Sequence, residues 1–195
     1  IKTMKKIFFQ LLAIIFFPLI TIIFSSNVYA QEGEEAFENT LKSTYTVNEN
    51  GNTYVEHLFT IKNLTPTYYI TKHGLRTSSP NINGVRVFDK SGNIDAEVTQ
   101  VNNQTNIGIT FSDKLVGEGK SRTFTISYNN PDLAQVNGNV LEVAIPKQAD
   151  PNQYTDTEVE LNTPLKFGNA NRVTPSTNFT QKLTDDGLRM TFGEL

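Results

Sequence analysis

The segment from Gly84 to Tyr128 constrains the fold more than any other part of the sequence. It holds four short runs in which every second residue is apolar, separated by clusters of Gly, Asn, Asp and Ser; the runs are 84–88, 94–101, 107–111 and 123–128. Alternation with a period of two is typical of β-strands, and short polar breaks between such runs predict an antiparallel meander. Because the apolar face must be covered by another layer, the segment predicts a two-sheet β-sandwich.

The flanking sequence supplies further strands for this sandwich. Residues 41–47 alternate, Asn50-Gly51 predicts a type I′ hairpin turn, and 53–62 predicts the returning strand. Further strands are predicted at 68–71, 140–145 and 157–161, with a polar loop at 131–139. The expected fold of residues 41–163 is therefore all-β, an antiparallel two-sheet β-sandwich that is immunoglobulin-like in general architecture.

The N-terminal residues predict a targeting segment. Lys5 and Lys6 precede an almost wholly apolar run at 7–24, and Val28-Tyr29-Ala30 places small residues at the usual cleavage positions. These features predict a signal helix within residues 1–30, cleaved before Gln31. The alternative is an uncleaved membrane anchor at 7–24, because such a helix spans about 27 Å. Both interpretations predict export to the cell envelope or the extracellular space, with residues 31–40 as a flexible acidic leader.

The pattern changes after Pro164. The sequence becomes irregular, and a further hairpin is predicted across Asp185-Asp186-Gly187, between 179–183 and 188–192. The given sequence ends at Leu195, directly after this strand. We expect residues 164–195 to be an incomplete β-rich segment of a protein that continues further.

Charge and cysteine content exclude several classes of function. Residues 1–30 carry three lysines and no acidic residue, so without them the net charge falls from −3 to −6. An acidic domain is a poor nucleic-acid binder, because contacts with phosphate dominate such affinity. The sequence contains no cysteine, which excludes disulfides, thiolate nucleophiles and cysteine-ligated zinc.

The two histidines are the first candidates for chemistry. His57 lies on the apolar face of the 53–62 strand, which predicts a packed or hydrogen-bonded core histidine, since a metal site needs several converging ligands. His73 stands next to Gly74 in a turn-prone segment and is predicted to face solvent. We assign no catalytic, cofactor-binding or metal-binding residue, and no cofactor is predicted.

Two segments superficially match ligand-binding loops. The run from Asp89 to Asp95 is similar to a calcium loop, but Gly92 stands at position four of the run and the EF-hand requires glycine at position six. A hairpin turn explains this run better. The run from Gly117 to Ser121 lacks the first glycine of a phosphate loop, and no helix is predicted after it. Among the carboxylates, Glu56, Glu118, Asp185 and Asp186 show no sign of desolvation and are predicted to be solvated.

Tyr68 and Tyr69 are a candidate binding surface for sugar or peptide. Adjacent residues of a strand point to opposite faces, so one of the two tyrosines is predicted to be in the core.

The order of strand and turn motifs between Leu41 and Phe192 resembles a known family. It is similar to the β-sandwich region that precedes the catalytic domain in exported bacterial transglutaminase-like superfamily proteins. The matching motifs are Tyr45-x-Val47 with Asn50-Gly51, 59–68, Gly84-Val85 with Asp89 and Gly92, Phe111, Val116-Gly117-x-Gly119, Phe124 with Tyr128, Val143-x-Ile145-Pro146, and Leu161-x-x-Pro164 with Phe167-Gly168.

The resemblance implies a non-catalytic accessory module. The family's activity rests on a Cys-His-Asp arrangement, which a chain without cysteine cannot supply. The implied partner is therefore a downstream domain of the same chain, or an envelope protein or glycan. Two alternatives remain open: a free-standing cell-surface adhesion or ligand-binding module, and the N-terminal sandwich of a metallopeptidase-like protein.

Overall fold

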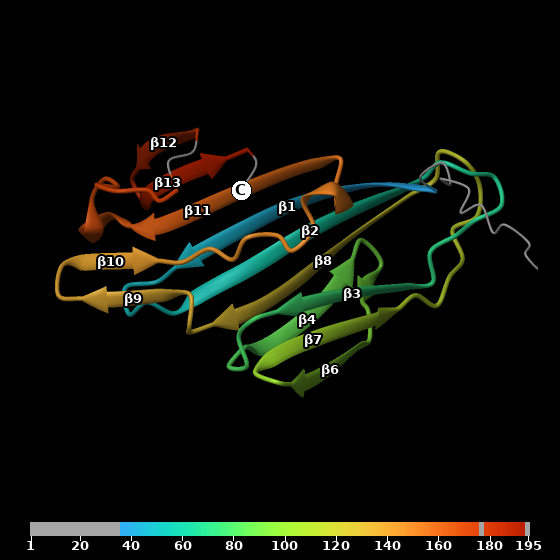
Figure 1. Ribbon diagram of the computed structural model, residues 1–195, viewed down its shortest axis with the longest axis horizontal. Helices are drawn as coiled ribbons and strands as arrows, with labels where there is room; N and C mark the ends of the chain where they lie inside the picture. Colours follow the sequence, from blue (N-terminus) through green and yellow to red (C-terminus); the bar gives the residue numbers. More distant parts are fainter. Residues whose placement is uncertain (1–35, 176–177, 194–195) are drawn as a thin grey trace, which may run out of the picture. The chain divides into compact units, whose positions relative to one another are not determined.

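The computed structural model describes residues 36–175 and 178–193, and the regular secondary structure of this part of the chain is almost entirely β-strand (Figure 1). The predicted signal helix within residues 1–30 lies outside the described residues. Neither of the two short 3-10 helices in the described part is long and apolar enough to cross a membrane. The first strand begins at Phe37, earlier than the expected sandwich boundary at Leu41.

Three sheets organise the described residues. Their elements are β1 (Phe37–Val47), β2 (Thr53–Asn63), β3 (Lys72–Thr77), β4 (Asn83–Asp89), β5 (Gly92–Asn93), β6 (Ala96–Val101), β7 (Gln104–Thr110), β8 (Ser121–Asn130), β9 (Ala134–Asn137), β10 (Val140–Val143), η1 (Pro151–Gln153), β11 (Asp156–Pro164), η2 (Leu165–Phe167), β12 (Phe179–Thr184) and β13 (Gly187–Phe192). The large sheet has the order β12-β13-β11-β1-β2-β8-β4-β5, a smaller sheet has the order β3-β7-β6, and β9 pairs with β10 (Figure 1).

One face of the large sheet forms the core. Along β2 every second residue is buried, and the matching residues of β8 lie opposite in register, so that Val55 faces Tyr128 and Phe59 faces Phe124. The Phe59 and Phe124 rings stack with centroids 5.2 Å apart. Burying side chains of this size stabilises the folded state by about 1.5–3 kcal/mol each. The period-two pattern of the sequence thus selects the face that is covered.

The smaller sheet supplies the second layer. Ile107 and Ile109 of β7 are buried within the same core cluster as the residues of β2 and β8. Phe111, directly after β7, contacts Phe124 with ring centroids 5.2 Å apart. The sheets are therefore arranged like a sandwich, and the all-β prediction is confirmed. One pair departs from the antiparallel expectation, because β1 and β11 run parallel.

The predicted meander from Gly84 to Tyr128 is wrong, since its four runs are divided between two sheets. β4 pairs with β8 and β5, whereas β6 pairs with β7 and β7 with β3. The long strand β8 pairs with β2 on one side and β4 on the other, so neither of its edges is open to β7. The β6–β7 hairpin joins the layer that covers the core, where Ile107 and Ile109 of β7 are buried while Val98 and Val101 of β6 are exposed.

Two turns differ in their chemistry from the prediction. The β1–β2 hairpin forms as expected, but five residues connect Val47 to Thr53 and only Gly51 among them has positive φ, at 87°. The Asn48 side chain accepts hydrogen bonds from the backbone N–H groups of Asn50 and Asn52 at 2.9 and 3.0 Å, which stabilises the longer loop. The tight turn with two positive φ values is instead at 102–103, between β6 and β7.

The predicted strand at 68–71 is a loop. The Asn63 side chain accepts the backbone N–H of Thr65 at 2.9 Å and donates to the Tyr68 carbonyl, and the Thr65 hydroxyl accepts the N–H of Tyr68 at 3.2 Å. These side chains bind the backbone groups that a strand would use in a ladder, so strand β3 begins only at Lys72.

Two other segments extend the sheets. The predicted polar loop 131–139 contains β9, whose residues pair with β10. The predicted hairpin across Asp185-Asp186-Gly187 is present, and its second strand, β13, pairs with β11 at the edge of the large sheet. Residues from the segment after Pro164 therefore contribute buried side chains, Leu188 and Met190 among them, to the same core.

Candidate functional site

His57 is the centre of a buried polar network that links three adjacent strands. Its Nδ1 lies 2.8 Å from the Ser43 hydroxyl of β1, and its Nε2 lies 3.0 Å from the Tyr128 hydroxyl of β8. Ser43 is directly opposite His57 in the β1–β2 register, so the pairing of these strands sets this contact. Every ring nitrogen of His57 has a partner, as expected for a satisfied core histidine.

Burial keeps the groups of this network uncharged. Desolvation lowers the pKa of His57 to about 4, and it raises the pKa of Tyr128. Burial also raises the pKa of the neighbouring Tyr45 to about 12, an effect that the Ser43 hydroxyl partly offsets. The imidazole is therefore neutral at neutral pH, and its surroundings are side chains of the core. The prediction of a packed, hydrogen-bonded histidine is confirmed.

His73 does not face solvent, so that prediction is wrong. It lies in strand β3 and its ring rests edge-on against Phe59 and Phe124, with centroids 4.6 and 5.1 Å apart. Desolvation lowers its pKa to about 4. The inward orientation of the His73 side chain follows from the alternation of a β-strand. Alternate residues of β3 point toward the core, so His73 points inward and its neighbour Gly74 faces outward.

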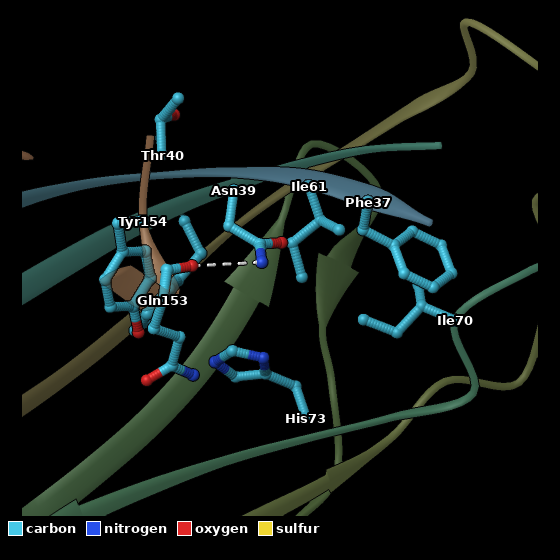
Figure 2. A pocket seen from close by; sticks show the side chains of 9 residues that line it. Phe37, Asn39, Thr40, Ile61, Ile70, His73, Gln153 and Tyr154 are labelled. Atoms are coloured by element: carbon cyan, nitrogen blue, oxygen red, sulfur yellow. Dashed lines mark hydrogen bonds between the residues drawn. The ribbon is translucent and has the colours of Figure 1, made fainter. Parts of the chain in front are cut away.

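A pocket opens beside His73, between the two layers. Its volume is about 140 Å³, and Figure 2 shows nine side chains from β1, β2, β3, the loop before β3 and the η1 segment around it. The lining residues are Phe37, Asn39, Thr40, Phe59, Ile61, Ile70, His73, Gln153 and Tyr154. His73 Nε2 is buried and has no hydrogen-bond partner among the described residues. It is the one lining group whose polar atom is both buried and unsatisfied there.

Backbone and side-chain hydrogen bonds fix the η1 segment as the wall of this pocket. Asn39 Nδ2 donates to the Gln153 carbonyl at 3.2 Å, and the Thr155 N–H donates to the Asn39 carbonyl at 2.8 Å. The η1 turn itself is capped by Asp150, whose side chain accepts the N–H of Asn152. The pocket is thus held by the fold on both sides, which favours a preformed site.

The other sequence candidates lie apart from this pocket. Asp89 ends β4, its side chain accepts the N–H of Ser91 at 2.7 Å, and Gly92 begins β5, so the run is a hairpin turn as predicted. The run from Gly117 to Ser121 leads into a strand. Glu118, Asp185 and Asp186 are exposed, and Glu56 is half-buried.

Neither tyrosine of the Tyr68-Tyr69 pair enters the core, which corrects the expectation for one of them. Tyr68 is 60% exposed, and Tyr69 is half-buried with the Lys114 ammonium 5.1 Å from its ring centroid. The expectation assumed a strand at 68–71, and the loop found there does not impose alternation.

The described lining of the pocket carries no charged side chain, since it includes no Asp, Glu, Lys or Arg. Within the described residues, no three side chains of His, Asp or Glu converge as a metal site requires. The pocket was not predicted from the sequence, because its lining residues come from four separate segments. The only signal was the alternation that places His73 on the inner face of a strand.

The sequence matches no protein-family model and no curated protein. Solved structures that match this chain include an M1 zinc metallopeptidase from Deinococcus radiodurans bound to a Tyr-Ser-Ala substrate, at 12% identity and a TM-score of 0.47, over 83% of this chain and 40% of that chain. Another structure of M1 zinc metallopeptidase from the same organism has 11% identity and a TM-score of 0.45, over 84% and 40% of the two chains. A candidate protease from Parabacteroides distasonis ATCC 8503 has 10% identity and a TM-score of 0.42, over 83% and 35%. This chain therefore spans about 40% or less of the length of these structures.

Proposed function

We propose that this chain is a non-catalytic β-sandwich module of an exported protein, and that it supports or positions a separate domain. One observation carries the proposal: of the only two histidines in the sequence, His57 is a neutral buried group and His73 is a neutral, partly buried group that packs on core rings. The sequence has no cysteine either, so neither a thiolate nor a freely titrating imidazole is available for acid–base or nucleophilic chemistry at neutral pH.

The class of the supported domain is a further proposal with two candidates. The motif resemblance favours a transglutaminase-like domain with a Cys-His-Asp arrangement. The alternative is a metallopeptidase-like domain, and M1 zinc metallopeptidases are the class to which two of the solved structures above belong. In both cases the catalytic residues would lie outside the given sequence.

The reading frame after Leu195 discriminates between these proposals. A Cys…His…Asp set would support the transglutaminase-like domain, and a His-Glu-x-x-His motif would support the metallopeptidase-like domain. A stop codon directly after Leu195 would refute an accessory role in a larger chain and favour the free-standing adhesion module.

A direct assay tests the non-catalytic claim. The purified chain is incubated with fluorogenic peptides and with glutamine- and lysine-containing peptides, with and without added Zn²⁺. We expect neither hydrolysis nor cross-linking above the buffer rate. Turnover that persists in a His57→Phe, His73→Phe double variant would point to contamination, whereas turnover lost in that folded variant would refute the proposal.

A further inference from the structure

We propose that the chain pairs with a second copy of itself through the open edge of β6, so that the smaller sheets of the two copies form one continuous sheet. The contact is antiparallel, and its two-fold axis passes through Val98. It is independent of the supporting role proposed above, because it uses residues of β6 alone. The directions of the backbone groups, the exposed side chains and the position of the one charge in β6 define the register.

The strand β6 is the outermost strand on its side of the smaller sheet (Figure 1). Its residues pair with β7, and among the described residues no backbone hydrogen bond joins β6 to any other segment. A strand edge of this kind exposes unpaired N–H and C=O groups that another strand can bind. The edge therefore selects an extended backbone as its partner, rather than a compact ligand.

The pairing on the far side of β7 shows which backbone groups of β6 are free. The Phe111 N–H donates to the Thr71 carbonyl at 2.9 Å, in continuation of the β3–β7 register, so the odd-numbered residues of β7 direct their backbone groups to β3. The even-numbered residues of β7 therefore bind the odd-numbered residues of β6. The groups that point to the open edge belong to the three remaining residues of β6, which are Ala96, Val98 and Gln100.

The edge of β6 lacks the features that prevent strand pairing. Natural edges use lysine, proline or a very short strand for this purpose. The edge strands β3 and β12 contain lysine, and the edge strands β5, β9 and β10 have two to four residues. In contrast, β6 has six residues and no lysine, arginine or proline, and its two valines, Val98 and Val101, are 45% and 54% exposed. Of the described edges, β6 is therefore the one best suited to accept another strand.

A second β6 fits this edge when Val98 lies opposite its counterpart in the other copy. Ala96 then lies opposite Gln100 on each side of the axis, which gives three hydrogen-bonded pairs. Glu97 lies opposite Thr99, whose hydroxyl can donate to the carboxylate, so no two like charges are opposite one another. The strand is thus complementary to itself in both backbone and charge.

The other symmetric registers fit less well. An axis at Glu97 would place the two Glu97 carboxylates opposite one another, which is destabilising. An axis at Thr99 would leave two hydrogen-bonded pairs within β6 in place of three, because Ala96 would lie opposite the turn residue Asn102. With the axis at Val98, the two valine side chains form a β-branched pair on the core-facing side, since Val98 is opposite the buried Ile107 of β7.

The size of the contact sets its strength. A strand of six residues is about 20 Å long. One such strand from each copy buries less surface than a permanent interface does. We therefore expect a weak dimer that forms reversibly as the protein concentration rises.

Cysteine substitution tests the register, because the sequence has no cysteine of its own. In Val98→Cys the two Cα atoms across the axis would be about 5.5 Å apart, a distance that suits a disulfide. In the matched control Val101→Cys they would be about 20 Å apart, because each residue lies three positions from the axis. With oxidised glutathione as the oxidant, Val98→Cys should therefore give a cross-linked dimer several-fold faster than Val101→Cys.

Sedimentation of the purified chain over a series of concentrations tests the dimer without a cross-link. The average mass of the unaltered chain should rise with concentration. Val98→Lys and Val98→Glu should each abolish this rise, because like charges meet at the axis, and an equimolar mixture of the two variants should restore it. Val116→Lys, a change at a 49% exposed valine outside β6, should leave the rise unchanged.

Each outcome decides the proposal. Faster cross-linking of Val98→Cys, together with recovery of the dimer in the mixed Lys and Glu variants, would support it. Equal cross-linking of the two cysteine variants, a monomer at every concentration, or association that survives Val98→Lys would overturn it. Since Val98 is 45% exposed, the variants should keep the far-UV circular dichroism of the unaltered chain, so a changed mass reports the interface rather than unfolding.

Discussion

Replacing each histidine by phenylalanine tests whether the two buried imidazoles have different structural roles. Both have the same lowered pKa, about 4, and both contact aromatic rings of the core. They differ in hydrogen bonding, because His57 has partners at both nitrogens and His73 Nε2 has none among the described residues. The two substitutions should therefore change the free energy of unfolding in different directions.

The expected magnitudes follow from these contacts. His57→Phe leaves the hydroxyls of Ser43 and Tyr128 without their partner in the core. Each orphaned buried group costs about 1–3 kcal/mol, and the more apolar ring offsets part of this, so we expect a net loss of about 2 kcal/mol or more at pH 7. His73→Phe orphans no described group and removes an unsatisfied nitrogen. It keeps the edge contacts with Phe59 and Phe124, so we expect unchanged stability or a gain of up to about 1 kcal/mol.

The assay is urea unfolding of the purified chain and both variants at pH 7, followed by tyrosine fluorescence and far-UV circular dichroism. Equal m-values would show that the changes in midpoint report stability rather than altered compactness. Equal destabilisation by the two substitutions would refute the reasoning, because it would mean that ring packing alone, and not the Ser43–His57–Tyr128 network, determines the cost.

Three further predictions concern pH, a glycine and an ion pair. The free energy of unfolding should fall as the pH is lowered from about 6.5 to about 4, because the unfolded state binds protons at histidines that the folded state keeps neutral. Each of the two histidines should account for a loss of roughly 2 kcal/mol at pH 5. In His73→Phe the loss should be smaller by the contribution of one histidine, as measured from urea midpoints across this pH range. Gly187→Ala should lower the free energy of unfolding by about 3 kcal/mol or more, because the new Cβ would lie 2.0 Å from a backbone carbonyl oxygen of β11. Hydrogen exchange should then become faster in the β12–β13 hairpin. The control Gly193→Ala, which has open space around it, should change stability by less than about 0.5 kcal/mol. Asp113→Asn should lower the free energy of unfolding by about 1 kcal/mol, because the Arg122 side chain, only 6% exposed, loses its 2.9 Å ionic contact with the Asp113 carboxylate. The hydrogen bond from Arg122 to the Asp113 backbone carbonyl remains. An unchanged thermal unfolding midpoint would contradict this expectation.

The sequence was sufficient to predict the strands, because burial on one face of a sheet leaves a direct period-two signal. The alternation of 53–62 predicted β2, and the same alternation placed His57 on its inner face. The sequence was insufficient to predict how the strands pair. The runs at 94–101 and 107–111 have the same pattern as those at 84–88 and 123–128, yet they belong to a different sheet. Pairing depends on which edges are free after β8 has bound β2 and β4, and no local pattern encodes that.

Loop structure escaped prediction where side chains compete for backbone groups. Asn63 binds the Thr65 N–H and the Tyr68 carbonyl, so an apolar run that is compatible with a strand forms a loop. That loop carries Ile70 to the pocket, and its course separates Ile70 from the alternation of β3. The error in one strand therefore also hid one wall of the candidate site.

The pocket and the hydrogen-bonded network follow from the same difference between the two histidines. Strand pairing places Ser43 and Tyr128 on either side of His57 within a single sheet, where neighbouring strands supply partners at fixed spacing. His73 reaches the core from the opposite layer, and its own sheet faces it only with packing side chains. β3 is an edge strand of the smaller sheet, so His73 has a neighbouring strand on one side only, and the residue opposite it there is the apolar Ile109. His73 Nε2 therefore finds no partner within its own sheet, whereas His57 lies between two strands that each supply a hydroxyl.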